Sequence, residues 1–240
     1  MDLKSKIILI SGPTASGKSK LALKIAKKIN GEIINADSMQ VYKELKILTA
    51  RPSEIDLKKI EHHLYGFRTV KKDFSSGEWL KLAKKNIKKI KDKNKIPVLV
   101  GGTGLYFKAL TDGLVKIPNI PISFRNKIRS MQNSLGQKKF YSKLLKNDSL
   151  VKNRIDPTDL QRSIRAYEVI SFTKKSIFEW YKKTKPSFRN DQFIKIYIDY
   201  PRDELISKIS KRVDQMMKNG AIQEVKDFLK LNLKSDSNIF

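Results

Sequence analysis

Short apolar runs alternate with segments of helical periodicity along the first 110 residues of the chain. Nearly continuous apolar runs predict three buried strands, at residues 6–10, 32–36 and 96–100. Apolar side chains at helical spacing predict three helices beside them, at residues 17–29, 74–91 and 105–110. Strands that alternate with helices in this way are typical of a doubly wound α/β sheet.

The pattern changes after residue 116. Residues 123–181 are helical in periodicity and strongly basic, and they contain no strand-like run. A helix start is indicated near residues 156–159, with Asp156 or Thr158 as candidate caps. We therefore expect a basic helical insertion at residues 117–189.

The α/β pattern returns near the end of the chain. Residues 193–198 predict another strand, and residues 203–217 predict a long helix that ends before Gly220. We expect residues 1–116 and 190–240 to form one α/β core around the insertion.

Charge adds a candidate partner. The chain has 240 residues, with 51 Lys and Arg against 24 Asp and Glu, so its formal net charge is +27. Such an excess favours a polyanionic partner, nucleic acid or an acidic membrane, although a compositional drift towards lysine is an alternative cause. The absence of cysteine excludes disulfides and thiol chemistry. No apolar run is long enough to span a bilayer and no signal-peptide pattern is present, so we expect a cytoplasmic protein without membrane partners.

One motif indicates phosphate binding. The segment after the first predicted strand matches G-x-x-x-x-G-K-[ST] and opens a helix. Its residues are Gly12, Pro13, Thr14, Ala15, Ser16, Gly17, Lys18 and Ser19. Backbone N–H groups in such a loop surround phosphates, the lysine adds charge and the Ser19 hydroxyl is a candidate Mg²⁺ ligand. The motif predicts a P-loop NTPase-like fold and a di- or triphosphate ligand, without specifying the reaction.

Polar residues follow two other predicted strands. Asp37 ends the second strand, at the sheet edge where ligands bind in this fold, so it is a candidate general base. A turn or capping role is the alternative. Gln40 is a candidate reader of an adenine edge. Gly101 and Gly102 permit close backbone approach to a ligand, and Thr103 offers a hydroxyl there.

Other candidate residues carry structural alternatives. His62 and His63 lack a third ligand nearby, and we interpret them as structural. Arg162 and Arg165 share a helix face suited to phosphates or bases, although a solvated basic face is an equal alternative. The same choice between ligand contact and solvation applies to further cations: Arg125, Arg129, Arg154, Arg202, Lys208 and Arg212.

Several segments in this order and spacing together resemble the tRNA dimethylallyltransferase family. They are residues 12–19, 35–42 (NADSMQVY), 49–53 (TARPS), 62–64 (HHL), 100–106 (VGGTGLY) and 159–166 (DLQRSIRA). The family usually has arginine where this chain has Lys208. It also usually continues beyond the point where this chain stops, so we expect the usual C-terminal segment to be missing.

The resemblance implies transfer of a dimethylallyl group from dimethylallyl diphosphate to N6 of the adenine beside the tRNA anticodon. Residues 12–19 would hold the diphosphate, with Mg²⁺ on Ser19. Asp37 would deprotonate the amine, and Thr103 would join it in the catalytic site. The tRNA-contact positions implied are Asp37, Ser38, Met39, Gln40, Thr103, Arg125, Gln161, Arg162, Ser163, Ile164 and Arg165.

The resemblance further implies that the helical insertion binds the anticodon stem–loop. We expect a monomer. Three alternatives stay open: a prenyltransferase acting on free adenosine phosphates, a small-molecule P-loop kinase, and a truncated protein that binds tRNA without catalysis.

Overall fold

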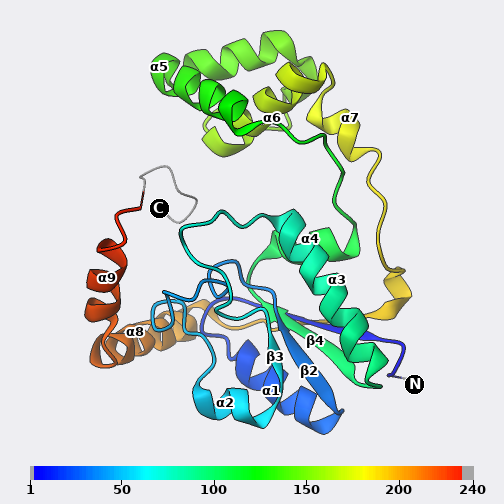
Figure 1. Cartoon of the computed structure of the whole chain (residues 1–240), viewed down its shortest axis with the longest axis vertical. Helices are drawn as coiled ribbons and strands as arrows, with labels where there is room; N and C mark the ends of the chain where they lie inside the picture. The colour runs from blue at the N-terminus through cyan, green and yellow to red at the C-terminus, as the bar shows by residue number, and fades with distance from the viewer. Residues whose placement is uncertain (1–2, 234–240) are drawn as a thin grey trace. The chain divides into compact units, whose positions relative to one another are not determined.

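The central sheet of the protein is parallel throughout (Figure 1). The computed structural model describes residues 3–233, and within them the sheet has five strands in the order β3-β2-β4-β1-β5. The strands are β1 (Ile7–Ser11), β2 (Gly31–Asn35), β3 (His62–His63), β4 (Ile96–Gly101) and β5 (Phe193–Tyr197). This arrangement confirms the predicted α/β class and places the carboxyl ends of all strands at one edge.

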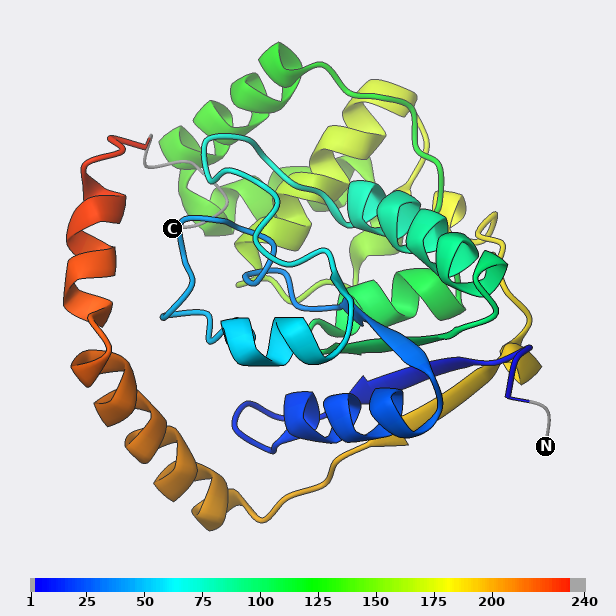
Figure 2. The same ribbon diagram turned by 60° about the horizontal axis from the view of Figure 1, so that its bottom comes forward.

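The two faces of the sheet are covered by different helices. Ile7 and Leu9 of β1 join the core cluster that contains residues of α3 (Ser76–Asp92) and α4 (Gly104–Thr111). The even-numbered residues of β1 join the cluster that contains residues of α1 (Lys18–Lys28). Because side chains alternate along a strand, a fully apolar strand such as β1 is buried on both faces. Figure 2 shows α1 lying along the sheet.

Six further helices complete the described chain. They are α2 (Glu54–Lys59), α5 (Ile122–Asn147), α6 (Leu160–Thr173), α7 (Ile177–Tyr181), α8 (Arg202–Lys218) and α9 (Ala221–Leu229), with short 3₁₀ turns at Ser149–Val151 and Asn190–Gln192. None of the helices in the described part of the chain combines the length and apolarity that crossing a bilayer requires.

The chain forms two compact units. One contains the sheet and consists of the described residues up to Thr111 and from Ser187 onward, and the other is Asp112–Pro186. The second unit has its own core, in which Phe140 and Leu144 of α5 pack with Ala166 and Val169 of α6. The long helix α5 is interrupted at Gly136, whose φ of 71° and ψ of 161° are not helical.

Three local features differ from the sequence prediction. The cap of α6 is Asp159, which accepts a hydrogen bond from the Arg162 N–H at 2.9 Å. The predicted cap Asp156 instead accepts from the N–H of Thr158 at 2.8 Å, in the turn before the helix. Two elements, β3 and α2, were not predicted, because two and six residues are too few to show a periodic pattern.

Candidate active site

The phosphate loop joins β1 to α1, as the sequence predicts. Gly17 lies just before α1 with φ of 87°, and Ala15 is also left-handed with φ of 62°. At Gly12 a Cβ atom would lie 3.0 Å from the Ile198 carbonyl oxygen and 3.1 Å from Ser16 Oγ. Ser16 Oγ is buried and has no hydrogen-bond partner among the described residues. The loop is therefore compact, and it contains a buried hydroxyl without a hydrogen-bond partner among the described residues.

A cavity of about 670 Å³ adjoins the loop and has many cationic side chains in its wall. The loop and α1 contribute Lys18, Ser19 and Lys20, the segment 46–51 contributes Lys46 and Arg51, and α8 contributes Lys208 and Arg212. Six cations around one hollow are suited to a polyanionic ligand such as a diphosphate. The sequence analysis gave no ligand role to Lys46 or to Arg51, which lies in the family segment 49–53, because the sequence does not show that this part of the chain lies beside the phosphate loop.

The charges near Lys18 act on one another. Burial lowers the pKa of the Lys18 ammonium, the nearby Asp37 carboxylate raises it and the Arg212 guanidinium lowers it, with a lowered pKa as the result. Lys18 Nζ donates to the Pro13 carbonyl oxygen at 3.0 Å. The phosphate loop, the end of β2 and helix α8 thus place these three charged groups within electrostatic reach of one another.

Asp37 follows β2 and is held in a tight turn. Its N–H donates to Asn35 Oδ1, and its Oδ1 accepts from the Met39 N–H, each at 2.9 Å. The Asn35 side chain also donates to the Asp37 carbonyl oxygen at 2.9 Å. Among the described residues no hydrogen bond engages Asp37 Oδ2. One carboxylate oxygen therefore orients the side chain, and the other is available to a proton donor.

The end of β4 lies directly against this turn. Thr103 Oγ1 accepts from the Ser38 N–H at 2.9 Å and donates to Ser38 Oγ at 3.3 Å. The Thr103 N–H donates to the Ala36 carbonyl oxygen at 3.2 Å. Thr103 therefore holds the segment around Asp37, and its hydroxyl already has two partners within the protein.

Gln40 has a contact that the sequence did not predict. Its Nε2 donates to the carbonyl oxygens of Thr49 at 2.8 Å and Ala50 at 3.2 Å. The amide nitrogen needed to read an adenine edge is thus engaged by the segment 46–51. In this structure Gln40 positions that segment next to Asp37.

In the second unit, two arginines surround a buried carboxylate. Glu168 is 3% exposed, with Arg165 Nη1 at 3.2 Å and Arg125 Nε at 4.0 Å from its Oε2. Gln161 and Arg162 are exposed. Ser163 is fully buried and Ile164 is 8% exposed. The side chains of these last two residues are buried within the unit, on the inner face of α6.

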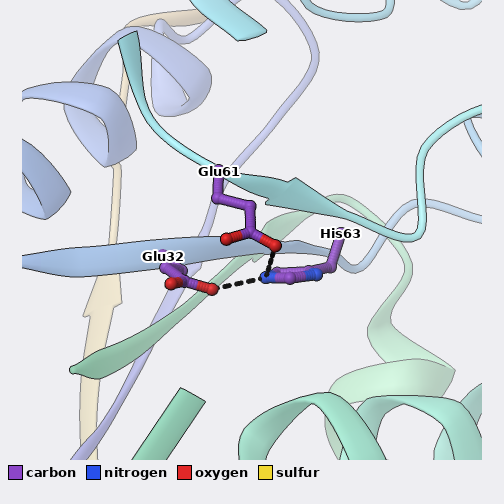
Figure 3. Close-up of side chains that lie close together, drawn as sticks. All are labelled: Glu32, Glu61 and His63. Atoms are coloured by element: carbon purple, nitrogen blue, oxygen red, sulfur yellow. Dashed lines mark hydrogen bonds and ion pairs between the residues drawn. The ribbon is translucent and has the colours of Figure 1, made fainter. Parts of the chain in front are cut away.

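One group among the described residues has the geometry of metal ligands. It consists of Glu32, Glu61 and His63, which lie close together (Figure 3). Glu32 is the second residue of β2, at the opposite edge of the sheet from the loop that follows β1. Its fully buried carboxylate accepts from His63 at 2.7 Å and pairs with Lys93 at 3.0 Å and Lys95 at 2.9 Å.

Desolvation alone would raise the pKa of Glu32, but the hydrogen bonds from Lys95, His63 and Lys93 outweigh it and lower the pKa to about 2. Lys93 and Lys95 already neutralise the carboxylate, so the group is a structural ion network. The interpretation of His63 as structural is consistent with this geometry.

The fold and the loop define a class: a P-loop α/β protein whose cation-lined cavity is suited to a phosphorylated ligand and has a carboxylate nearby. The family model that matches residues 40–240 is that of IPP transferase. The chain belongs to this family. It is 60% identical over 239 residues to the tRNA dimethylallyltransferase of Pelagibacter ubique, and 43% identical over 230 residues to that of Allorhizobium ampelinum.

The matches cover 100% and 95% of this chain, and 76% of the length of each of these two relatives. A eukaryotic dimethylallyltransferase acting on tRNA superposes with a TM-score of 0.80 at 29% identity, covering 94% of this chain and 56% of that one. The tRNA isopentenylpyrophosphate transferase of Bacillus halodurans superposes with a TM-score of 0.62 at 32% identity, covering 96% and 72%. These findings favour a tRNA prenyltransferase over the kinase, free-nucleotide and non-catalytic alternatives.

Proposed function

We propose that this chain transfers a dimethylallyl group from dimethylallyl diphosphate to N6 of the adenine beside the tRNA anticodon. The observation that supports the proposal is the position of Asp37. Its carboxylate lies within electrostatic reach of Lys18 in the phosphate loop, and the cavity beside that loop is lined by cations. A nucleophile oriented by Asp37 and a diphosphate bound at the loop would be neighbours, as group transfer requires.

The diphosphate would bind to the phosphate loop, with Lys18, Lys208 and Arg212 around it. The Ser19 hydroxyl lines the same cavity and fits one ligand position of Mg²⁺, since this ion takes oxygen ligands and is commonly shared between one or two protein groups and substrate phosphates. When bound there, Mg²⁺ would neutralise charge on the leaving diphosphate. The cationic side chains supply the same stabilisation from the protein side.

In the chemical step, the adenine N6 attacks C1 of the dimethylallyl group, and the bond from C1 to the diphosphate oxygen breaks. The electron pair of that bond leaves with the diphosphate. Asp37 Oδ2 accepts the proton that N6 loses, while Asp37 Oδ1 keeps its hydrogen bond to the Met39 N–H. Thr103 keeps the turn in place through Ser38.

The tRNA contacts belong to the turn at residues 37–40 and to the second unit. Exposed Gln161 and Arg162, with Arg165 and Arg125, are suited to the phosphates and bases of the anticodon stem–loop. The adenine must leave the base stack, because a stacked base cannot present N6 to an enclosed carboxylate. All of these residues lie on one chain, and we expect a monomer to be active.

Asp37→Asn tests the assignment of the base. We expect the single-turnover rate of transfer of labelled dimethylallyl to tRNA to fall by about 10²–10⁴-fold, because the amide accepts no proton. Binding of inorganic diphosphate, measured by calorimetry, should change little. Transfer at the wild-type rate would exclude Asp37 as the base.

Parallel reactions of the wild-type protein with AMP and with ATP test the acceptor. Label in AMP or ATP, without label in tRNA, would contradict the proposed acceptor. Absence of label in every reaction, with tRNA binding intact, would contradict the proposed activity.

A further inference from the structure

A carboxylate from the last described helix binds three consecutive backbone amides of a distant segment. Glu224 of α9 accepts at Oε1 from the N–H groups of Lys46 at 2.7 Å and Ile47 at 2.8 Å, and at Oε2 from the N–H of Leu48 at 2.9 Å. Successive N–H groups that point to one spot form an anion-binding concavity. In this chain the carboxylate of Glu224 is the anion that the three N–H groups bind.

The other side of the same segment is held by the neighbourhood of the proposed base. Gln40, three residues after Asp37, donates to the carbonyl oxygens of Thr49 and Ala50. The segment closes on itself through the Arg51 N–H, which donates to the Lys46 carbonyl oxygen at 3.1 Å. Residues 46–51 are therefore fixed at their amides by Glu224 and at their carbonyls by Gln40.

Helix α9 is anchored where it makes this contact. Phe228, one turn after Glu224, packs against the apolar cluster that contains Val41, Tyr42 and Leu45. These residues precede the segment directly in sequence. Glu224 thus projects from a helix that is anchored through Phe228.

The segment forms part of the wall of the cavity at the phosphate loop. Lys46, Ile47, Ala50 and Arg51 line it, opposite residues of the loop and of α8. Arg51 Nη2 donates to the Lys43 carbonyl oxygen at 2.9 Å, while its buried Nε has no partner among the described residues. The position of these two cations therefore depends on how residues 46–51 are held.

We propose that Glu224 is a positioning residue for substrate binding: by holding the amides of residues 46–48, it fixes Lys46 and Arg51 at the wall of the diphosphate cavity. The inference rests on the proposed function for the identity of the anion. It assigns to α9 a role in the site although no α9 side chain lines the cavity.

Simple electrostatics and a positioning role predict opposite changes in diphosphate affinity when the Glu224 carboxylate is removed. Removing a carboxylate makes the neighbourhood more positive, and Glu224 lies within electrostatic reach of Arg51. If charge alone mattered, Glu224→Ala would bind a diphosphate more tightly. If Glu224 positions the segment, the same variant binds the diphosphate more weakly, because the two cations lose their fixed places.

The test is calorimetric titration of the full chain with inorganic diphosphate, with and without Mg²⁺. We expect Glu224→Ala to raise Kd by roughly tenfold, and Glu224→Gln, which keeps one acceptor oxygen, to raise it less. Hydrogen exchange at the amides of residues 46–48 should accelerate by at least about tenfold in Glu224→Ala, with exchange in β1 and β4 unchanged. Unchanged exchange, or tighter diphosphate binding, would overturn the proposal.

Asp227→Ala is the matched control. Asp227 lies on the same helix, and its side chain is 56% exposed and paired with Lys230. The Asp227→Ala substitution removes the same charge but leaves the contact between Glu224 and residues 46–48 in place. The Kd for diphosphate should therefore stay within about twofold of the wild-type value. If Glu224→Ala does not fold, Glu224→Gln carries the test alone, with the same two readouts. Because neither readout requires group transfer, failure of this proposal is distinguishable from failure of the proposed activity.

Discussion

At the scale of single residues, Gly101 shows how closely the two strands that form the site approach each other. A Cβ atom at this position would lie 2.1 Å from the carbonyl carbon and oxygen of Ala36 and 2.7 Å from the Asp37 nitrogen. These are backbone atoms, which cannot move aside without displacing the turn that holds Asp37. The glycine is therefore required by the approach of β4 to the end of β2.

Gly101→Ala should destabilise the protein by about 2–3 kcal/mol, because overpacking against backbone forces a shift of one strand. The free energy of unfolding from urea titration measures this. Gly104→Ala is the control, since Gly104 begins α4 and a Cβ there meets nothing within 4 Å. That variant should be neutral or more stable by up to about 1 kcal/mol. Equal effects of the two substitutions would contradict the steric argument.

Single residues also show which parts of the site could be predicted from the sequence. Asp37 and the phosphate loop follow buried strands, and strand ends meet at one edge in a parallel sheet, so their neighbourhood was predictable. The contacts of Gln40 and Glu224 were not. Each depends on where residues 46–51 pass in space. That segment has no periodic pattern, and its overlap with the family segment 49–53 does not show which residues it contacts.

At the scale of elements, the buried ion network ties β2 to its neighbours. Glu32 of β2 contacts His63 of β3 and the two lysines that flank the turn between α3 and β4. The short strand β3 pairs with β2 over only two residues. We infer that side-chain contacts compensate for this short backbone ladder. A strand of this length has no hydrophobic signature, which explains why the sequence did not predict it.

The lowered pKa of Glu32 sets a pH dependence of stability. A carboxyl whose pKa falls from 4.5 to about 2 on folding stabilises the protein above its unfolded pKa. That contribution is lost as the pH falls from about 4.5 towards 2. Glu32→Gln should lower the free energy of unfolding at pH 7 by about 2 kcal/mol, discounted for the partly exposed lysines. It should also flatten the dependence of unfolding free energy on pH between 5 and 3.

Thermal and urea unfolding at several pH values measure both effects. Glu61→Gln is a suitable comparison, because Glu61 also pairs with Lys93 but its side chain is 46% exposed. Its substitution should cost less than about 1 kcal/mol. A steep acid transition that persists in Glu32→Gln would assign the pH dependence to other carboxyls.

At the scale of the whole molecule, a net charge of +27 belongs to a chain that forms two units. The alternation of strand and helix predicted the α/β class, and the loss of that alternation indicated an inserted helical segment. The periodicity of apolar residues could predict both features, because the burial of side chains imposes that spacing on a strand or a helix. The charge pattern could not show which basic residues bind a ligand and which are only solvated, since both kinds have the same sequence pattern. Within α6, the structure shows that Ser163 and Ile164 are buried and that Arg162 is exposed.

Arg162→Ala and Arg189→Ala distinguish a local tRNA contact from a general effect of charge. Both arginines are exposed, at 74% and 81%, and each is paired with an aspartate, Asp159 or Asp191. Only Arg162 belongs to the predicted tRNA-contact segment. Binding of an anticodon stem–loop, followed by fluorescence anisotropy at several salt concentrations, should weaken severalfold in Arg162→Ala, and the slope of log K against log salt should fall by about 0.7–0.9. Arg189→Ala removes the same charge and should leave the slope unchanged, because a cation that contacts no phosphate releases no counterion. Equal losses in the two variants would mean that net charge, and not the face of α6, determines how this protein binds RNA.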